Sequence, residues 1–306
     1  MRKLLVLVLF LLPVVMASPA AAARVAVLMS AKVDEYEDAV RGFKGAFPHQ
    51  IVALYDMDTD LDRGRKQLAD IESKVKPDLI FAVGIWALQV VVSRPSPVPV
   101  VYAMVLNPPS IIGVDTKNIT GASINVPVEQ PIWLLKQLQP QVKRIGVIFN
   151  RAKTGYLVTR AQAVARNEGL ELITREISSA KDAIGALESF QDGIDALWIV
   201  PDETVLSQTM VQQMLLFSYR RKIPLIGLSD RHAQMGALFA LSFASSEDIG
   251  RQAGEIAQAI LGGRAAADVP YTTARKLYLT VNLKAAHKLG LEIPQAILAR
   301  ATNVIQ

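Results

Sequence analysis

Short apolar runs alternate with amphipathic helical segments along nearly the whole chain, and this alternation constrains the fold more than any other feature. The runs are apolar on both faces, as parallel strands are when helices cover both sides of their sheet. In the first part of the chain the expected strands are residues 24–29, 51–55, 79–83 and 98–105. Helical patterns begin between them, near residues 35, 61 and 85. The first part is therefore predicted to be a layered β/α structure.

The same order of elements then starts again. The expected strands of this second series are residues 144–149, 170–177, 196–200 and 223–228, with helical patterns from about residues 155, 180 and 205. In each series a strand is followed by a loop that opens a helix and then by a proline-led strand, as in PDLIFAVGIWAL with PVPVVYAM and DALWIVPDETVL with KIPLIGLS. We predict an α/β fold with two Rossmann-like lobes, each built on a parallel sheet.

Three segments are candidates for the connections between these lobes. The first is the polar, glycine-containing stretch 118–126. The second follows an expected strand at 237–243, where Ser245-Ser246-Glu247-Asp248 has the spacing of a capping box. The third lies near 276–282. Three crossings would place the lobes on a hinge with a cleft between them. The predicted division is residues 24–120 plus 246–276 for the N-terminal lobe and residues 121–245 plus 277–306 for the C-terminal lobe.

The first 23 residues have the pattern of a secretory signal peptide. Arg2 and Lys3 precede an apolar run at 4–16, and alanines at 21–23 provide a cleavage site near Ala23. The run is shorter than the roughly 20 residues that span a bilayer. The sequence has no cysteine, so it offers no disulfide, no thiolate metal site and no point for N-terminal lipidation. We expect a periplasmic protein without a lipid anchor.

Charge and motifs disfavour two other classes of protein. The net charge is +5, and loss of Arg2 and Lys3 would leave 5 minus 2, or +3, spread over the chain, so we expect no nucleic-acid partner. His49, His232 and His287 lack the spacing of metal ligands, and G-x-S-x-G, P-loop and G-x-G-x-x-G motifs are missing. We therefore expect no metal, no cofactor and no catalysis, and a secreted hydrolase is a minor alternative.

In open parallel sheets, ligands bind beyond the carboxyl ends of the strands, where loops open helices. Candidate ligand residues follow from that rule. They are Ser30, Gly84, Trp86, Met104 and Asn107 in the first series, and Asn150, Thr154, Asp202, Thr204, Ser229 and Asp230 in the second.

Each candidate has a structural alternative. The Asp202 carboxylate suits a ligand ammonium, with Thr204 beside it, but Asp202 can equally cap a helix. Ser229 and Asp230 occupy the same topological position and have the same alternative. The Trp86 ring can stack on a planar ligand or pack beneath a loop. Taking the first interpretation, we expect Asp202→Ala to weaken ligand binding and leave the fold intact.

Segments along nearly the whole chain resemble the family of ATP-binding-cassette (ABC) substrate-binding proteins, which includes receptors for aromatic amino acids such as tryptophan. They include RVAVLMSAKVDEYEDAV, PDLIFAVGIWAL, PVPVVYAMVLNPP, NITGAS, RIGVIFN, ALWIVPDETV, KIPLIGLS, GALFALSFASSEDIGRQAGEIAQAILGG and LTVNLKAAHKLGLEIP. The resemblance implies a type I periplasmic-binding fold that encloses a small-molecule ligand between its lobes and delivers it to an ABC permease. We expect the protein to be a monomer. The matching contact loops hold Ser30, Gly84, Trp86, Ala87, Asn107, Asn150, Asp202, Thr204, Ser229 and Asp230.

Two cleft positions depart from the family's pattern. Asn107-Pro108-Pro109 stands where Asp-Pro is common, which removes a carboxylate, and Gly84-Ile85-Trp86 stands where small residues and Thr are usual. An amino acid or an aromatic compound is the favoured ligand. The alternative function is a periplasmic sensor that presents its ligand to a receptor kinase or chemoreceptor; neighbouring permease and ATPase genes would favour transport.

Overall fold

The computed structural model describes residues 22–46, 50–94, 96–113, 116–191 and 193–306. The predicted signal peptide lies outside these residues except for its last two positions. Within the described part, no helix combines the length and the apolar character needed to cross a membrane.

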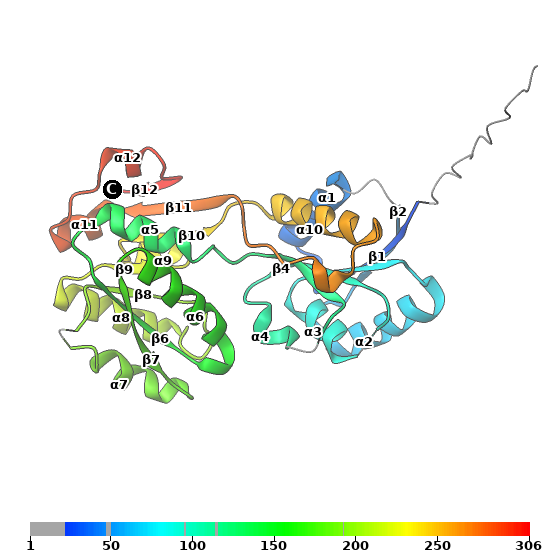
Figure 1. The fold of residues 1–306 in the computed structure, drawn as a ribbon, viewed down its shortest axis with the longest axis horizontal. Coiled ribbons are helices and arrows are strands. Elements are labelled where there is room, and N and C mark those ends of the chain that lie inside the picture. Colours follow the sequence, from blue (N-terminus) through cyan, green and yellow to red (C-terminus); the bar gives the residue numbers. More distant parts are fainter. Residues whose placement is uncertain (1–21, 47–49, 95, 114–115, 192) are drawn as a thin grey trace, which may run out of the picture.

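Two sheets form the centres of two lobes, which lie side by side in Figure 1. The first sheet has the strand order β2-β1-β3-β4-β5 and the second has the order β12-β11-β10-β9-β8-β6-β7. The strands of the first are β1 (Arg24–Met29), β2 (Gln50–Asp56), β3 (Leu79–Val83), β4 (Val100–Val105) and β5 (Ile119–Ser123). Those of the second are β6 (Arg144–Phe149), β7 (Glu171–Glu176), β8 (Ala196–Trp198), β9 (Leu225–Gly227), β10 (Phe239–Phe243), β11 (Leu277–Asn282) and β12 (Asn303–Ile305).

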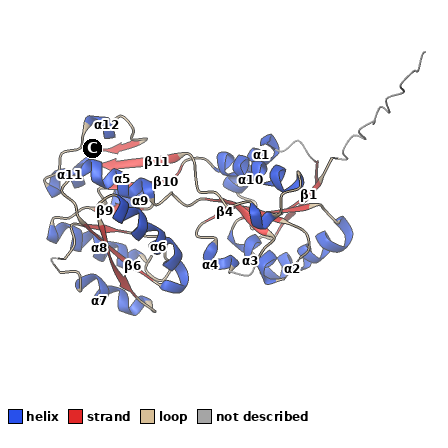
Figure 2. Cartoon of the chain, viewed as in Figure 1, coloured by secondary structure: helices blue, strands red, loops and turns tan. Residues whose placement is uncertain are grey.

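Helices cover both faces of each sheet (Figure 2). The first lobe contains α1 (Asp34–Ala46), α2 (Leu61–Asp70), the π-helical turn η1 (Ile71–Val75), α3 (Ile85–Ser93), α4 (Pro109–Ile112), α10 (Ser246–Leu261) and the 3₁₀ turn η3 (Ala266–Asp268). The second contains α5 (Glu129–Leu138), α6 (Arg151–Asn167), the 3₁₀ turn η2 (Ala180–Asp182), α7 (Ala183–Glu188), α8 (Gln208–Arg221), α9 (Asp230–Met235), α11 (Leu283–Leu289) and α12 (Gln295–Leu298).

The packing of β1 shows why the strands are continuously apolar. Val25 and Val27 pack into a cluster with residues of α1 and α10, whereas Ala26 and Leu28 pack into a second cluster with residues of α2 and α3. All four side chains are buried. Side chains alternate between the faces of a strand, so a sheet covered on both sides needs an apolar residue at every position.

Three connections join the lobes, at 124–128, at 244–245 and just before β11, so each lies beside a predicted segment without coinciding with it. The predicted capping box at the second is confirmed, because the Ser245 hydroxyl accepts the Asp248 amide at 3.1 Å as α10 begins. Between the second and third connections, α10 returns to the first lobe and packs on α1 (Figure 1).

The stretch 118–126 is not wholly a connection, because β5 pairs with β4 through Ser123. Its polar side chains bind the returning chain: Thr120 Oγ1 donates to the Val269 carbonyl at 2.7 Å, and Ser123 Oγ donates to the Thr272 carbonyl at 3.0 Å. Polarity here therefore reflects tertiary hydrogen bonds. The division into lobes at 120/121 stays a prediction, and the pairing of β5 favours moving that boundary to follow Ser123.

The second sheet differs from the predicted parallel arrangement at one pair of strands. β11 runs antiparallel to β10, and β12 then pairs parallel with β11. The chain returns from the first lobe just before β11, so it enters the sheet from the cleft side and runs opposite to β6, β8, β9 and β10. β11 coincides with the third predicted connection, 276–282, whereas β12 lies in a stretch for which no strand was predicted.

Candidate functional site

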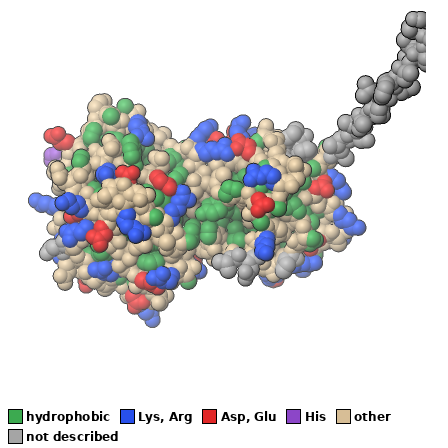
Figure 3. Space-filling view, viewed as in Figure 1, with side chains coloured by type: hydrophobic (Ala, Val, Ile, Leu, Met, Phe, Trp, Pro, Cys, Tyr) green, Lys and Arg blue, Asp and Glu red, His purple; other side chains and the backbone are tan. Residues whose placement is uncertain are grey.

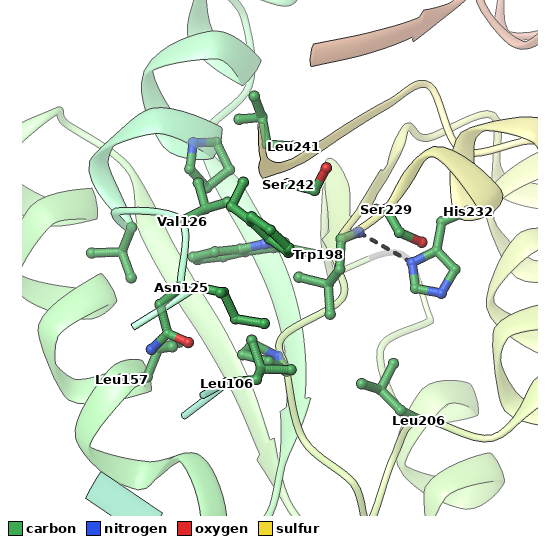
Figure 4. A pocket seen from close by; sticks show the side chains of 17 residues that line it. Leu106, Asn125, Val126, Leu157, Trp198, Leu206, Ser229, His232, Leu241 and Ser242 are labelled. Atoms are coloured by element: carbon green, nitrogen blue, oxygen red, sulfur yellow. Dashed lines mark hydrogen bonds between the residues drawn. The ribbon is translucent and has the colours of Figure 1, made fainter. Parts of the chain in front are cut away.

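Two adjoining cavities lie between the lobes, where the carboxyl ends of β4, β6, β8 and β9 meet. The first, of about 320 Å³, is shown in Figure 4. Its lining comes from the second lobe, from the first connection and from the loop after β4. The lining residues are Leu106, Ile124, Asn125, Val126, Val128, Pro131, Leu157, Trp198, Pro201, Leu206, Gly227, Leu228, Ser229, His232, Leu241, Ser242 and Phe243.

The first cavity is apolar, with Trp198 as its largest lining side chain. Trp198 ends β8 and is only 4% exposed, so its ring is held in place by packing. Among the described residues that line this cavity there is no Asp, Glu, Lys or Arg; polar groups come from Asn125, Ser229, His232 and Ser242. Such a site suits an apolar or aromatic body oriented by a few hydrogen bonds.

His232 lies at one side of this cavity as a neutral residue. Its Nδ1 accepts the Leu228 amide at 3.1 Å, which places the proton of the neutral ring on Nε2 (Figure 4). Burial lowers the pKa of His232 below its ordinary value, and the nearby Arg231 lowers it further. The ring is therefore uncharged at pH 7, and its basic nitrogen is occupied by the backbone.

The second cavity, of about 550 Å³, is lined by both lobes. It shares Leu106, Pro201 and Leu206 with the first, so the two are adjacent. Its remaining lining residues are Ile85, Gln89, Val92, Ser93, Asn107, Ser110, Ile111, Lys153 and Glu203. Figure 3 shows hydrophobic side chains gathered where the lobes meet.

Asn107 joins the lobes by hydrogen bonds. It adopts a left-handed backbone conformation with φ of 56° and is 6% exposed. Its Nδ2 donates to the Lys153 carbonyl in α6 at 2.8 Å, and its Oδ1 accepts the Tyr156 hydroxyl. Its amide donates to Asn125 Oδ1 at 2.9 Å, which ties the loop to the first connection. Burial raises the pKa of Tyr156, so its hydroxyl remains a donor at neutral pH.

Asn150, Asp202 and Thr204 are brought together, but they bind one another. The Asp202 carboxylate is 0% exposed. It accepts the Asn150 amide at 2.7 Å, the Thr154 hydroxyl at 2.5 Å and the Thr204 amide at 2.9 Å. The Asn150 side chain caps α6 by accepting the Ala152 amide. None of the three lines either cavity, so their ligand contact stays a prediction.

Ser30, Gly84 and Ala87 also form a group. The buried Ser30 hydroxyl accepts the Ala87 amide at 2.9 Å and so holds the first turn of α3. Gly84 has φ of 89°, and a Cβ there would lie 2.6 Å from Ser30 Oγ. Trp86, in the same turn, is 38% exposed and lines neither cavity. The group shapes the entrance to α3, and its contact with a ligand stays a prediction.

The adjacent residues Ser229 and Asp230 are placed differently. Ser229 lines the first cavity, and its side chain makes no capping hydrogen bond. The Asp230 carboxylate instead accepts Thr280 Oγ1 at 2.7 Å and Asn303 Nδ2 at 2.9 Å. These hydrogen bonds lower the pKa of Asp230. Ten residues were predicted from the matching contact loops. Two of them line a cavity: Ser229 lines the first and Asn107 lines the second.

The prediction missed Trp198, His232, Asn125, Lys153 and Glu203. Trp198 carried no local signal, because the strand at 196–200 is apolar and buried on both faces, so alternation does not show which face borders a cavity. Asn125 lay in the stretch interpreted as a connection, and nothing local indicates that this connection lines a cavity.

A family model described as ABC transporter substrate binding protein matches residues 25–305. The chain belongs to this family. Among curated relatives of this substrate-binding protein, a tyrosine-binding protein of Clostridioides difficile (strain R20291) is 26% identical over 237 residues, covering 75% of this chain and 66% of that protein. An uncharacterized protein of Rickettsia prowazekii (strain Madrid E) is 26% identical over 208 residues, covering 68% and 65%. The chain thus spans just under two thirds of each relative.

Solved structures confirm the fold of the substrate-binding protein. A conserved domain protein of Vibrio cholerae matches with a TM-score of 0.61 and 26% identity, covering 92% of this chain and 99% of that one. An ABC domain of Streptococcus pneumoniae in complex with L-Trp matches with a TM-score of 0.61 and 22% identity, covering 93% and 100%. The ligand-free, open structure of a Clostridium difficile substrate-binding protein with adhesive properties matches with a TM-score of 0.68 and 23% identity, covering 93% and 99%.

Proposed function

We propose that this protein is the periplasmic receptor of an ABC uptake transporter and binds a small organic molecule with an apolar, planar body between its lobes. The observation that carries the proposal is the first cavity: an apolar chamber beside Trp198, at the carboxyl ends of parallel strands and adjacent to a cavity lined by both lobes. Relatives named for binding tyrosine or solved with L-Trp support a ligand of this kind.

The lining also provides a way to couple binding to closure. Ile124 and Asn125 belong to the first connection, and Phe243 ends the strand that leads into the second. A ligand in the cavity therefore touches segments whose backbone must change when the lobes move. The ligand shifts the population toward the closed form only to the extent that it binds the closed form more tightly than the open form. In the proposed cycle, the closed monomer docks on a permease and releases the ligand chemically unchanged.

Filling the cavity should weaken binding strongly without unfolding the protein. Ser242 lines the first cavity, and a phenylalanine there would occupy space that the ligand needs. We expect Ser242→Phe to weaken ligand binding more than tenfold and to leave the melting temperature of the free protein within a few degrees. The measurement is a thermal-shift screen of amino acids, aromatic carboxylates and nucleosides, followed by calorimetry with each hit, because a ligand that binds only the folded state raises its melting temperature.

Ser178→Phe is the matched control, since Ser178 is exposed and lines neither cavity. A hit that binds both variants and the unmodified protein equally would place the ligand elsewhere. Uptake of the hit by cells should be lost on deletion of the gene and restored by the unmodified protein but not by Ser242→Phe; unchanged uptake after deletion would contradict the role in transport.

A further inference from the structure

We propose that His232 is a positioning residue of the ligand site. Its uncharged ring holds one wall of the first cavity in place, and a proton gained by the ring releases that wall and weakens ligand binding. The inference rests on the proposed function and adds a form of regulation to the same site, because it makes ligand capture depend on pH.

The wall is the turn between β9 and α9. Gly227, Leu228 and Ser229 line the first cavity, and His232 follows them in the first turn of α9. Ser229 begins the helix, but its side chain makes no capping hydrogen bond. The His232 ring takes that role, because its Nδ1 accepts the Leu228 amide at 3.1 Å (Figure 4). The backbone adds a hydrogen bond from the His232 amide to the Ser229 carbonyl at 2.9 Å.

His232 packs closely against the strand end that it holds. A Cβ added to Gly227 would lie 2.7 Å from the Cβ of His232. The ring also borders a third cavity, of about 230 Å³, beside the start of α8, and Leu206 lines this cavity and the first as well. A movement of the ring therefore changes the shape of the first cavity.

The charged groups around the ring are cations. Among the described residues that line the first and third cavities, the charged one is Arg231. The elements packed on α9 are α8, β9, β10 and β11. The titratable residues of α8 are 219–221, a tyrosine and two arginines at its carboxyl end, whereas its first turn borders the third cavity. The three strands contain no charged residue, and their titratable side chain is that of Tyr278.

The carboxylates on adjoining segments have partners of their own. Asp230, in α9 itself, accepts side-chain donors from β11 and β12. Asp202 and Glu203 lie in the loop before α8. Asp202 accepts three donors, and Glu203 pairs with Lys153. A charged His232 ring would therefore have to draw a carboxylate away from an existing partner.

A proton on the ring breaks the hydrogen bond that holds the wall. Neutral imidazole has one donor and one acceptor nitrogen, whereas imidazolium has two donors. A protonated Nδ1 would face the Leu228 N–H, so Leu228 and Ser229 would move away from the ring. Burial lowers the pKa of His232 and Arg231 lowers it further, so the change takes place below the ordinary value of 6.5. A ligand that needs the intact wall then loses affinity by about tenfold for each pH unit below that lowered pKa.

The experiment compares the pH profiles of three variants. In His232→Asn, Oδ1 is attached to Cγ as Nδ1 is, so the variant keeps an acceptor that does not titrate. His232→Leu removes the acceptor as well. The control is His287→Asn, because His287 is exposed in α11 and lines neither the first nor the third cavity. The probes are L-tryptophan, L-tyrosine and indole, measured by calorimetry between about pH 4 and pH 8.

In the unmodified protein, probe affinity should be constant above the pKa of His232 and should fall about tenfold per pH unit below it. An NMR titration of the ring in the free protein gives that pKa. His232→Asn should remove the fall. His232→Leu leaves the Leu228 amide without its acceptor, so it should bind about tenfold more weakly than His232→Asn at every pH. The His287→Asn control should keep the profile of the unmodified protein.

A fall in affinity that persists in His232→Asn would overturn the inference, and so would an affinity that stays constant across the measured pKa of His232. In both cases Ser242→Phe would still weaken binding of the same probe, so the proposed function would stand. If none of the three probes binds, the NMR resonance of the Leu228 amide decides. It should shift at the pKa of His232, and a resonance that does not shift would contradict the inference.

Discussion

Gly250→Ala is expected to destabilise the first lobe by about 3 kcal/mol or more, because overpacking against backbone cannot be relieved by a change of rotamer. A Cβ on Gly250 of α10 would lie 1.8 Å from the carbonyl oxygen of Ala39 in α1. The approach is reciprocal, since a Cβ on Gly42 of α1 would lie 1.9 Å from the carbonyl oxygen of Glu247 in α10. The two helices must therefore separate to admit a single methyl group.

Urea denaturation measures the effect, and Gly45→Ala is its control. Gly45 also lies in α1, and a Cβ added to it would meet nothing within 4 Å. Alanine there should leave the stability unchanged or raise it by up to about 1 kcal/mol. Because α10 lies between the second and third connections, its displacement should also weaken ligand binding at cavities that it does not line. A Gly250→Ala protein as stable as the unmodified chain would show that the helices separate without cost.

The layered fold was predictable because burial on both faces makes its strands apolar at every position. Val25 to Leu28 illustrate this, since adjacent residues enter different clusters and all are buried. β5 was not predicted, because its Thr120 and Ser123 form hydrogen bonds with residues about 150 positions later in the sequence. When the hydrogen-bond partners are so far away in the sequence, the local sequence of a polar strand is the same as that of a loop.

The site was predictable in location and less so in detail. The rule that ligands bind beyond strand ends selected Asn107 and Ser229, which line the cavities, but also Ser30 and Asn150, whose side-chain oxygens bind backbone amides at the start of a helix. Both arrangements use the same residue types at the same positions, so local sequence does not separate them. Only the tertiary structure shows which side a polar group faces.

Asp202→Ala is expected to lower the free energy of unfolding by about 3–5 kcal/mol, because three donors lose their buried carboxylate acceptor and a donor left unpaired costs about 1–3 kcal/mol. Those donors are the amides of Asn150 and Thr204 and the hydroxyl of Thr154. The Thr154 hydroxyl keeps one long contact, of 3.5 Å, with the Asn150 carbonyl. The result would differ from the sequence-based expectation of an intact fold with weakened binding. Binding should weaken too, because Asp202 joins the turn that carries Lys153 to the loop that carries Glu203.

Two comparisons separate this structural role from direct ligand contact. Glu203→Ala removes the adjacent carboxylate, which is 72% exposed, and should leave the urea midpoint nearly unchanged. Thr154→Val removes one donor but keeps the Asp202 carboxylate, so it should reproduce part of the loss of stability, by about 1 kcal/mol. If Asp202→Ala instead kept the midpoint of the unmodified protein and lost only affinity, its carboxylate would have to reach the ligand. That outcome would require the closed form to open the hydrogen-bonded group of Asn150, Thr154 and Thr204, because the carboxylate is 0% exposed here.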